Sequence, residues 1–142
     1  MPSNFSMKAM NAAHRLMLFV TRGNLGWSAN GMPVLELTTT GRLSGKQRST
    51  MLTCPLVEGT NYVVVASRGG DDSHPAWFLN LRDNPEVTAV IEGGNEQPML
   101  AHIATAEERA RMWPIITGKH ANYAGYQERT EREIPLVVLS PR

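Results

Sequence analysis

The 142-residue sequence has few of the residues that build disulfide scaffolds and metal centres. It contains one cysteine, Cys54, which excludes an internal disulfide and any metal site made from several cysteines. The four histidines are far apart and form no H-x-x-x-H pair; they are His14, His74, His102 and His120. We therefore expect no bound metal.

An excess of one charge is also absent, since the sequence has 14 Lys and Arg residues and 13 Asp and Glu residues, which gives a net charge of +1. Nucleic-acid-binding domains usually present a basic field, so no nucleic-acid partner is expected. The apolar run from Met17 to Val20 is far shorter than the ~20 residues of a membrane span, and the N-terminus shows no convincing signal peptide. We therefore expect a cytoplasmic protein.

What the sequence does contain is typical of one globular domain, because 42% of its residues are apolar and only 19% are charged. Residues 1–32 are expected to form an amphipathic helix over 7–21 and a glycine-rich loop, and residues 33–142 the main domain. The apolar face of this helix is rich in methionine, so a peripheral membrane contact is one expected role for it. Apolar runs bounded by turns predict strands at 33–39, 49–57, 62–67, 87–92, 99–104 and 134–139.

Two further helices are predicted from local signals. Pro75 suits the first turn of a helix, because its missing N–H has no intrahelical partner there. Thr105 and Glu108 have the spacing of a capping box, which begins a helix expected to run to Thr117 with a kink at Pro114. Together with the short links between strands, these elements predict an α+β fold, a small and mostly antiparallel β-barrel with covering helices.

The stretch from 66 to 81 combines a strand end, a glycine loop and the start of a helix. Gly69 and Gly70 let the backbone approach a ligand closely. Free N–H groups at a helix start attract anions, Arg68 adds forked donors, and Trp77 adds an aromatic face. These features favour a flat anionic cofactor, and the alternative is an ordinary tight turn with a core tryptophan.

A second candidate site is the turn over residues 41–48. It differs from a nucleotide-binding P-loop in its glycine spacing, and Gln47 replaces the magnesium-binding hydroxyl. Its cations and hydroxyls suit phosphate or carboxylate groups, since arginine binds both in bidentate fashion. The alternative is an exposed basic turn that binds nothing. The candidate residues are Arg42, Ser44, Lys46, Arg48, Ser49 and Thr50.

Several separated motifs then occur in a recognisable order. They are L-T-T-T-G-R-L-S-G-K-Q-R at 37–48, A-S-R-G-G at 66–70 with H-P-A-W at 74–77, N-P-E-V at 84–87, and Y-A-G-Y-Q-E-R-T at 123–130 followed by E-I-P-L-V-V at 133–138. On these motifs the chain resembles the deazaflavin-dependent nitroreductase family of actinobacteria. These are split β-barrel oxidoreductases that use coenzyme F-420, an 8-hydroxy-5-deazaflavin. The resemblance covers roughly residues 33–141.

The resemblance implies how the cofactor is held. Coenzyme F-420 carries a ribityl phosphate, a lactate and a glutamate tail, so the basic turn is expected to hold its anionic end. Asn80 is expected to reach a polar edge of the cofactor, and Trp77 to pack beside the ring or the substrate. The phosphate–ribityl and ring region is expected at Ala66, Ser67, Arg68, Gly69 and Gly70.

The resemblance also implies the reaction, a hydride transfer from reduced coenzyme F-420 to an electron-poor acceptor such as a quinone, an activated alkene or a nitro-aromatic compound. Tyr123 and Tyr126 are expected over the substrate pocket with His120, which replaces a tyrosine found in many relatives. Tyr123, Tyr126 and Ser67 are the candidate donors to the charge that develops on the substrate. Leu43 replaces a frequent lysine, so one cation for the tail is missing.

Two alternatives are left open. The first is an FMN-dependent reductase of the same fold, although FMN lacks the long tail that three cations would serve. The second is a non-catalytic carrier of the deazaflavin or of a hydrophobic ligand. Both a monomer and a homodimer are compatible with the sequence.

Overall fold

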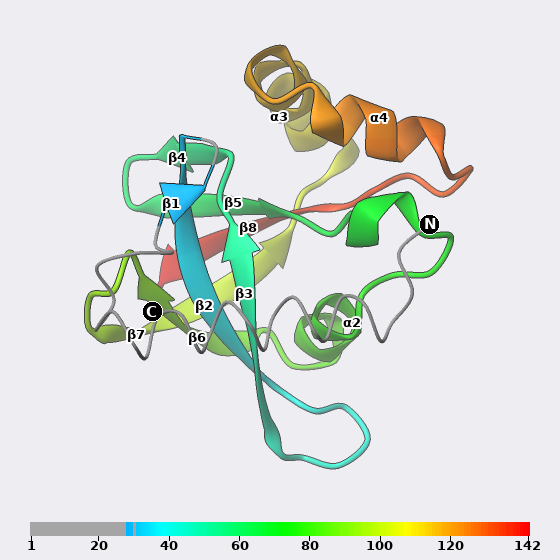
Figure 1. The fold of residues 1–142 in the computed structure, drawn as a ribbon. Helices are drawn as coiled ribbons and strands as arrows, with labels where there is room; N and C mark the ends of the chain where they lie inside the picture. Colours follow the sequence, from blue (N-terminus) through cyan, green and yellow to red (C-terminus); the bar gives the residue numbers. More distant parts are fainter. Residues whose placement is uncertain (1–27, 30) are drawn as a thin grey trace.

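The computed structural model describes residues 28, 29 and 31–142, and within them one curled antiparallel sheet carries the helices (Figure 1). The strand order is β1-β2-β6-β7-β8-β5-β4, and β3 pairs with the free edge of β2. This arrangement confirms the predicted α+β split barrel. The strands are β1 (Ser28–Ala29), β2 (Met32–Thr40), β3 (Gln47–Thr53), β4 (Leu56–Glu58), β5 (Asn61–Val65), β6 (Glu86–Ile91), β7 (Glu96–Ile103) and β8 (Leu136–Pro141).

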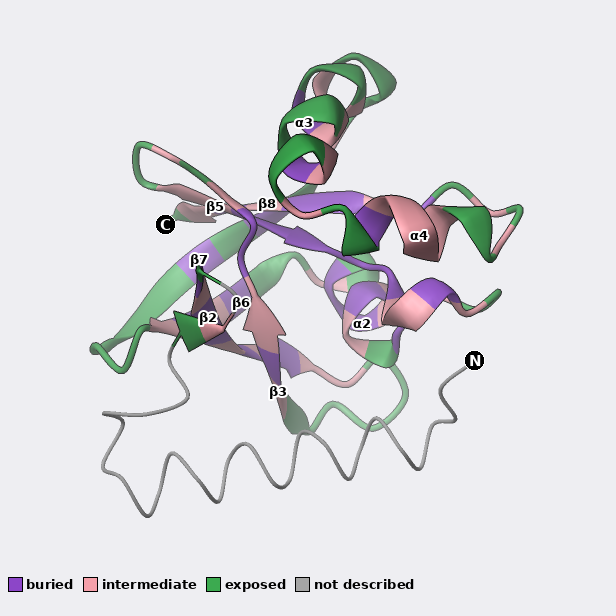
Figure 2. Ribbon diagram, turned by 45° about the horizontal axis from the view of Figure 1, so that its top comes forward, coloured by how far each residue is buried: buried purple, intermediate pink, exposed green. Residues whose placement is uncertain are grey.

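The sheet is buried on both faces where β5 and β8 lie. Successive side chains of a strand point to opposite faces, so Val64 enters one cluster while Val63 and Val65 enter another. The first cluster packs against α2 (Ala76–Asp83), and the second against α3 (Ala106–Lys119) and α4 (Asn122–Glu128). In Figure 2 the buried segments run through the sheet between these two helical layers.

The prediction of one strand over 49–57 is wrong, because the chain breaks at Cys54 and Pro55 into β3 and β4. Proline has no N–H for a sheet ladder, so it marks the corner at which the chain leaves β2 and joins β5. The Cys54 N–H donates to the Pro33 carbonyl at 2.8 Å, and its thiol donates to the Leu56 carbonyl. The cysteine is buried at this corner, and burial raises the pKa of its thiol to about 11.

The helices differ from prediction at several ends. Pro75 is the N-cap of α2 and not its first residue. The capping box at Thr105 and Glu108 is confirmed, since each side chain bonds the other residue's N–H. Beyond it α3 continues as one helix through Pro114 and Gly118 to Lys119, two residues past the predicted end. The carbonyl of the buried Ile116 accepts the last helical hydrogen bond, from the N–H of His120. The polar segment after residue 120 contains a further helix, α4, which polarity alone did not reveal.

The N-terminal predictions fall mostly outside the described residues. The helix over 7–21 is among these. The glycine-rich loop expected after it, up to residue 32, is wrong in its last part, because Ser28 and Ala29 pair with Pro33 and Met32 as a short antiparallel ladder.

Candidate cofactor site

The glycine loop leaves β5 and turns through three consecutive residues of positive φ. Ser67 is right-handed helical, and Arg68, Gly69 and Gly70 follow with φ of 47°, 66° and 86°. The turn is closed by two bonds, from the Gly70 N–H to the Ser67 carbonyl at 2.9 Å and from the Asp71 N–H to the Arg68 carbonyl at 3.2 Å. A right-handed residue followed by a left-handed one directs successive N–H groups into a concavity that binds anions.

Three N–H groups of this loop have no hydrogen-bond acceptor among the residues that the structure describes. They belong to Ser67, Arg68 and Gly69. Ser67 is buried, with 8% of its surface exposed, and an unpaired buried N–H is costly. Anionic oxygens of a ligand would satisfy these donors, so this loop fits the phosphate of a cofactor. On the opposite side of the loop, Arg132 donates hydrogen bonds to the carbonyls of Ala66, Ser67 and Asp71. Sequence reasoning did not identify this residue.

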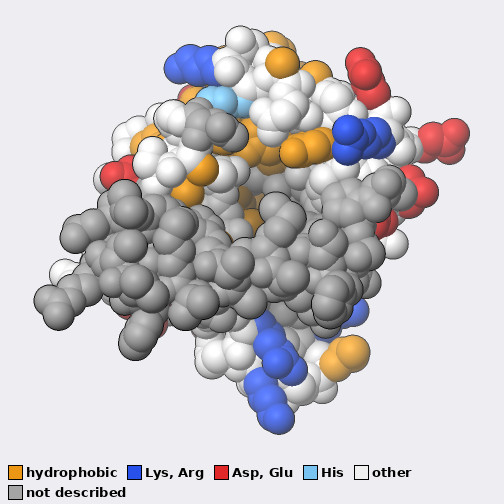
Figure 3. All heavy atoms as spheres, viewed as in Figure 1, with side chains coloured by type: hydrophobic (Ala, Val, Ile, Leu, Met, Phe, Trp, Pro, Cys, Tyr) orange, Lys and Arg blue, Asp and Glu red, His pale blue; other side chains and the backbone are white. Residues whose placement is uncertain are grey.

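The basic turn joins β2 and β3 at the far end of their hairpin. Its backbone is closed by bonds from the Gly41 N–H to the Lys46 carbonyl and from the Gly45 N–H to the Gly41 carbonyl, both 2.8 Å. Arg42, Lys46 and Arg48 are exposed, and none of them makes an ion pair within residues 31–142. In Figure 3 basic side chains gather over this hairpin at the bottom of the view. Free guanidinium and ammonium groups here suit the carboxylates of a cofactor tail.

Asn80 anchors the basic turn to α2. Its Oδ1 accepts from the Arg42 N–H at 3.1 Å, and its Nδ2 donates to the Thr39 hydroxyl at 3.1 Å. Asn80 was predicted to contact the cofactor, but it is only 5% exposed, and both the oxygen and the nitrogen of its side-chain amide are hydrogen-bonded within the protein. In Figure 1 α2 lies between the glycine loop above it and the basic turn below it. The helix therefore sets the position of the two candidate halves of one extended site.

The remaining residues of the predicted cofactor set have local roles. The Ser44 hydroxyl accepts from the Lys46 N–H at 3.2 Å, and the Ser49 hydroxyl bonds that of Thr38 at 2.7 Å. Thr50 is half-buried on β3 opposite Leu37, Ala66 is buried, and Trp77 lies half-buried on α2, edge-on to Phe78.

The aromatic residues of α4 lie beside the glycine loop. The rings of Tyr123 and Tyr126 pack edge to face with centroids 5.9 Å apart, and His120 packs against Tyr123 at 6.4 Å. The Tyr123 hydroxyl lies 2.8 Å from the Thr53 hydroxyl and 3.7 Å from the Met32 sulfur, and burial raises the pKa of this tyrosine. Tyr126 and His120 are half-exposed. Of the three predicted substrate residues on this segment, these two are therefore the ones open to a ligand.

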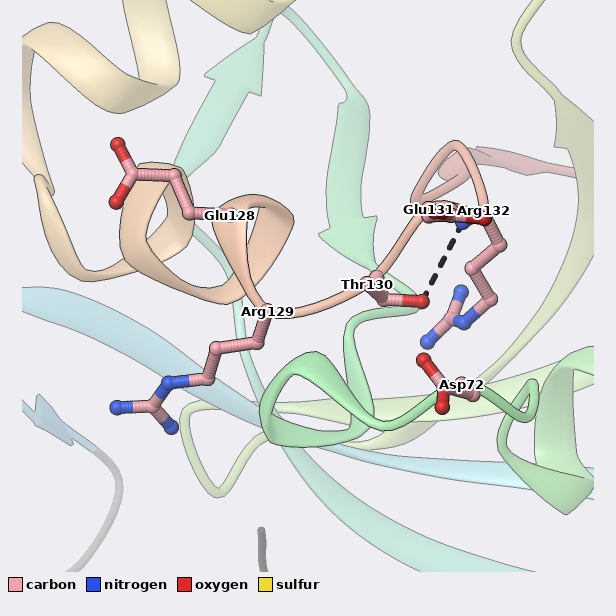
Figure 4. Close-up of a pocket in the computed structure, with 6 residues that line it drawn as sticks. All are labelled: Asp72, Glu128, Arg129, Thr130, Glu131 and Arg132. Carbon is pink, nitrogen blue, oxygen red and sulfur yellow. Dashed lines mark hydrogen bonds between the residues drawn. The ribbon is translucent and has the colours of Figure 1, made fainter.

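A pocket of about 510 Å³ lies where the C-terminal end of α4 meets the segment after the glycine loop (Figure 4). In this view Arg132 extends toward Asp72, whereas Arg129 extends away from both. The lining charges are of both signs, so the pocket favours no ligand of one charge. None of the predicted site residues lines it. The lining residues are Asp72, Glu128, Arg129, Thr130, Glu131 and Arg132.

The fold and the two candidate anion-binding segments are those of a split-barrel protein that suits an anionic cofactor. A Clostridium acetobutylicum protein of the pyridoxinephosphate oxidase family, related to a general stress protein, shares the fold at 11% identity and a TM-score of 0.54. A solved structure of the F420-H2-dependent reductase FDR-A is much more similar, with 37% identity, a TM-score of 0.66, and coverage of 76% of this chain and 94% of its own. A chain described as a domain-swapped dimer matches at 31% identity and a TM-score of 0.68, over 91% of this chain and 99% of its own.

Sequence comparisons agree with the structural ones. The F420H(2)-dependent quinone reductase Rv1261c of Mycobacterium tuberculosis is 39% identical over an alignment of 128 residues, which covers 86% of this chain and 83% of the relative. The family model of the F420H(2)-dependent quinone reductases matches residues 12–141. The chain belongs to this family. The predicted family resemblance, enzyme class and cofactor type are thereby confirmed.

Proposed function

We propose that this protein reduces a quinone, taking the hydride from reduced coenzyme F-420. Membership of the quinone reductase family supports the reaction and the cofactor. The observation that carries the assignment to this chain's own residues is the cationic turn at Arg42, Lys46 and Arg48, which makes no ion pair within residues 31–142 and is held to α2 by Asn80. A long anionic tail needs such a turn, whereas FMN has no group that would reach it.

The residues divide into two binding segments. The N–H groups of Ser67 and Arg68 donate to the cofactor phosphate, and the side chains of the basic turn bind the tail carboxylates. Because α2 lies between these segments in Figure 1, an extended ligand would cross this helix, which carries the half-buried Trp77.

When bound, the reduced deazaflavin supplies the hydride. The negative charge that develops on a quinone oxygen needs a hydrogen-bond donor, and a donor in a site shielded from water is worth more than one in solution. The hydroxyl of Tyr126 is our first candidate donor, followed by Ser67 and His120, since Tyr126 is half-exposed beside the glycine loop. Tyr123 holds the Tyr126 ring edge to face, and its own hydroxyl is engaged by Thr53.

The test is a fluorescence titration with coenzyme F-420 and separately with FMN. Arg48→Ala should weaken F-420 binding roughly fivefold, about 1 kcal/mol for an exposed charge contact, and leave FMN unaffected. Leu43→Lys should strengthen F-420 binding, because Leu43 is 90% exposed and a lysine there adds a cation at no packing cost. Lys119→Ala, an exposed cation on α3, is the control and should change neither affinity.

The alternatives predict different results. An FMN-dependent reductase would bind FMN more tightly than F-420. A carrier would bind reduced F-420 without its oxidation by menadione or a nitro-aromatic acceptor. Unchanged F-420 affinity in Arg48→Ala would overturn the assignment of the tail to the basic turn.

Two finer expectations accompany this proposal. The helix over 7–21 is expected to make a peripheral membrane contact, and vesicle flotation of the full chain would test it. In the described part of the chain, no helix has the length and apolarity that crossing a membrane requires. We expect either a monomer or a homodimer in solution, which sedimentation would decide.

A further inference from the structure

We infer that Arg132 is the positioning residue of the glycine loop, holding from behind the two peptide groups whose N–H ends face the cofactor. This inference rests on the proposed function, because it assigns a role in binding coenzyme F-420. It concerns a residue 65 positions away from Ser67 in the chain, in the segment between α4 and β8.

The guanidinium of Arg132 donates to three carbonyls of the loop. Nη1 bonds the carbonyl of Ala66 at 3.2 Å, Nη2 that of Ser67 at 2.8 Å, and Nε that of Asp71 at 2.8 Å. In a planar trans peptide the C=O and N–H bonds point in opposite directions. Holding the carbonyls of Ala66 and Ser67 therefore turns the N–H groups of Ser67 and Arg68 away from Arg132. These are two of the three N–H groups of the loop that have no acceptor in the described structure, the third being that of Gly69.

The charge of Arg132 adds to this effect. All four of its bonds go to neutral acceptors, the three carbonyls and Nδ1 of His74, and no carboxylate within residues 31–142 pairs with its guanidinium. The side chain is partly buried, and a guanidinium keeps its charge. The carboxylates of Asp71 and Asp72 interact with this charge electrostatically without bonding it. The positive charge lies behind the loop, where it favours an anion bound at the loop's N–H face.

His74 and α4 hold the guanidinium in place. Nδ1 of His74 accepts from Nη1 at 3.1 Å, so the neutral ring carries its proton on Nε2, and burial together with the nearby Arg132 charge lowers the pKa of His74. The backbone of Arg132 is bonded to Gln127 and Thr130 at the end of α4. Arg132 thus connects the glycine loop to the helix that carries Tyr126, and sets the cofactor donors relative to the substrate residues.

The test compares Arg132→Lys with wild type and with Arg111→Ala. Lysine keeps the charge but not the fork that reaches three carbonyls. Arg111 is the matched control, because on α3 it makes two bonds to Glu58 at 2.7 and 2.9 Å, away from the loop. The measurements are F-420 affinity by fluorescence, the KM for menadione at saturating F-420, and thermal unfolding.

Arg132→Lys should weaken F-420 binding about tenfold, which is the loss expected for hydrogen bonds to a charged group. The KM for menadione should stay within about twofold of the wild-type value. Arg111→Ala should keep the wild-type affinity for F-420 even if its unfolding temperature falls as much as that of Arg132→Lys. Equal affinity of Arg132→Lys and wild type would overturn the inference. If the wild type itself binds no F-420, the proposed function fails instead.

Amide hydrogen exchange tests the loop without the cofactor. The Gly70 and Asp71 amides should be protected in the wild type and lose protection in Arg132→Lys but not in Arg111→Ala. If Arg132→Lys does not fold, the wild type alone decides, since rapid exchange at both amides would show that Arg132 does not hold this loop.

Discussion

Replacing Gly70 by alanine tests how closely the glycine loop and α4 are packed. A Cβ added at Gly70 would lie 2.7 Å from the backbone oxygen of Tyr126 and 2.9 Å from Cβ of Arg129. The first of these atoms belongs to a helix backbone and cannot rotate away. The backbone at Gly70 also has a φ of 86°, which residues with side chains rarely adopt.

The expected loss of stability has two parts. Placing a side chain in the left-handed region costs about 1–2 kcal/mol. Forcing apart two well-packed segments costs about 1–3 kcal/mol more. Gly59→Ala is the matched control, because Gly59 has a φ of 63° and a Cβ there meets no described atom within 4 Å. It should lose the first part alone, so the difference between the variants should be about 1–3 kcal/mol.

Urea unfolding of both variants measures this difference, and the F-420 titration measures its consequence for the site. Gly70→Ala should bind F-420 more weakly than wild type, since the loop or α4 must move, and Gly59→Ala should bind it equally well. Equal losses of stability in the two variants would refute the close packing of Gly70 against Tyr126. A lower stability of Gly70→Ala with unchanged F-420 affinity would refute its connection to the cofactor.

Three other predictions concern α4 and the start of α3. Tyr126→Phe should lower turnover by about 10- to 100-fold with little change in F-420 affinity, and unchanged turnover would leave this tyrosine a packing residue. Tyr123→Phe should instead lower the free energy of unfolding by about 1 kcal/mol, because the Tyr123 hydroxyl bonds that of Thr53 inside the protein. Its turnover should fall less than that of Tyr126→Phe. The pKa of Glu108 is lowered to about 2, chiefly by the Thr105 N–H and then by His102. Its stabilisation is therefore complete above about pH 4.5 and is lost as the pH falls toward 2, and acid unfolding of Glu108→Gln should lack this component.

Local patterns were sufficient for much of the fold. The strand over 33–39 alternates in the sequence and forms β2, and the threonine–glutamate spacing at 105–108 forms the capping box. Gly69 and Gly70 adopt positive φ readily, so the glycine loop could be predicted as a turn. The corner at Pro55 had a local signal too, but an apolar run on both sides concealed it.

The sequence by itself therefore determined most of the strands, the glycine loop, the basic turn and the family. Only the tertiary structure decided which side chains act on these segments: Arg132 behind the loop, Asn80 under the basic turn 38 residues from Arg42, and Thr53 at the hydroxyl of Tyr123, 70 residues away. The physical reason is that propensity, capping and turn chemistry depend on neighbours within a few residues. The partner of a distant polar group depends on how the sheet curls and where its helices pack.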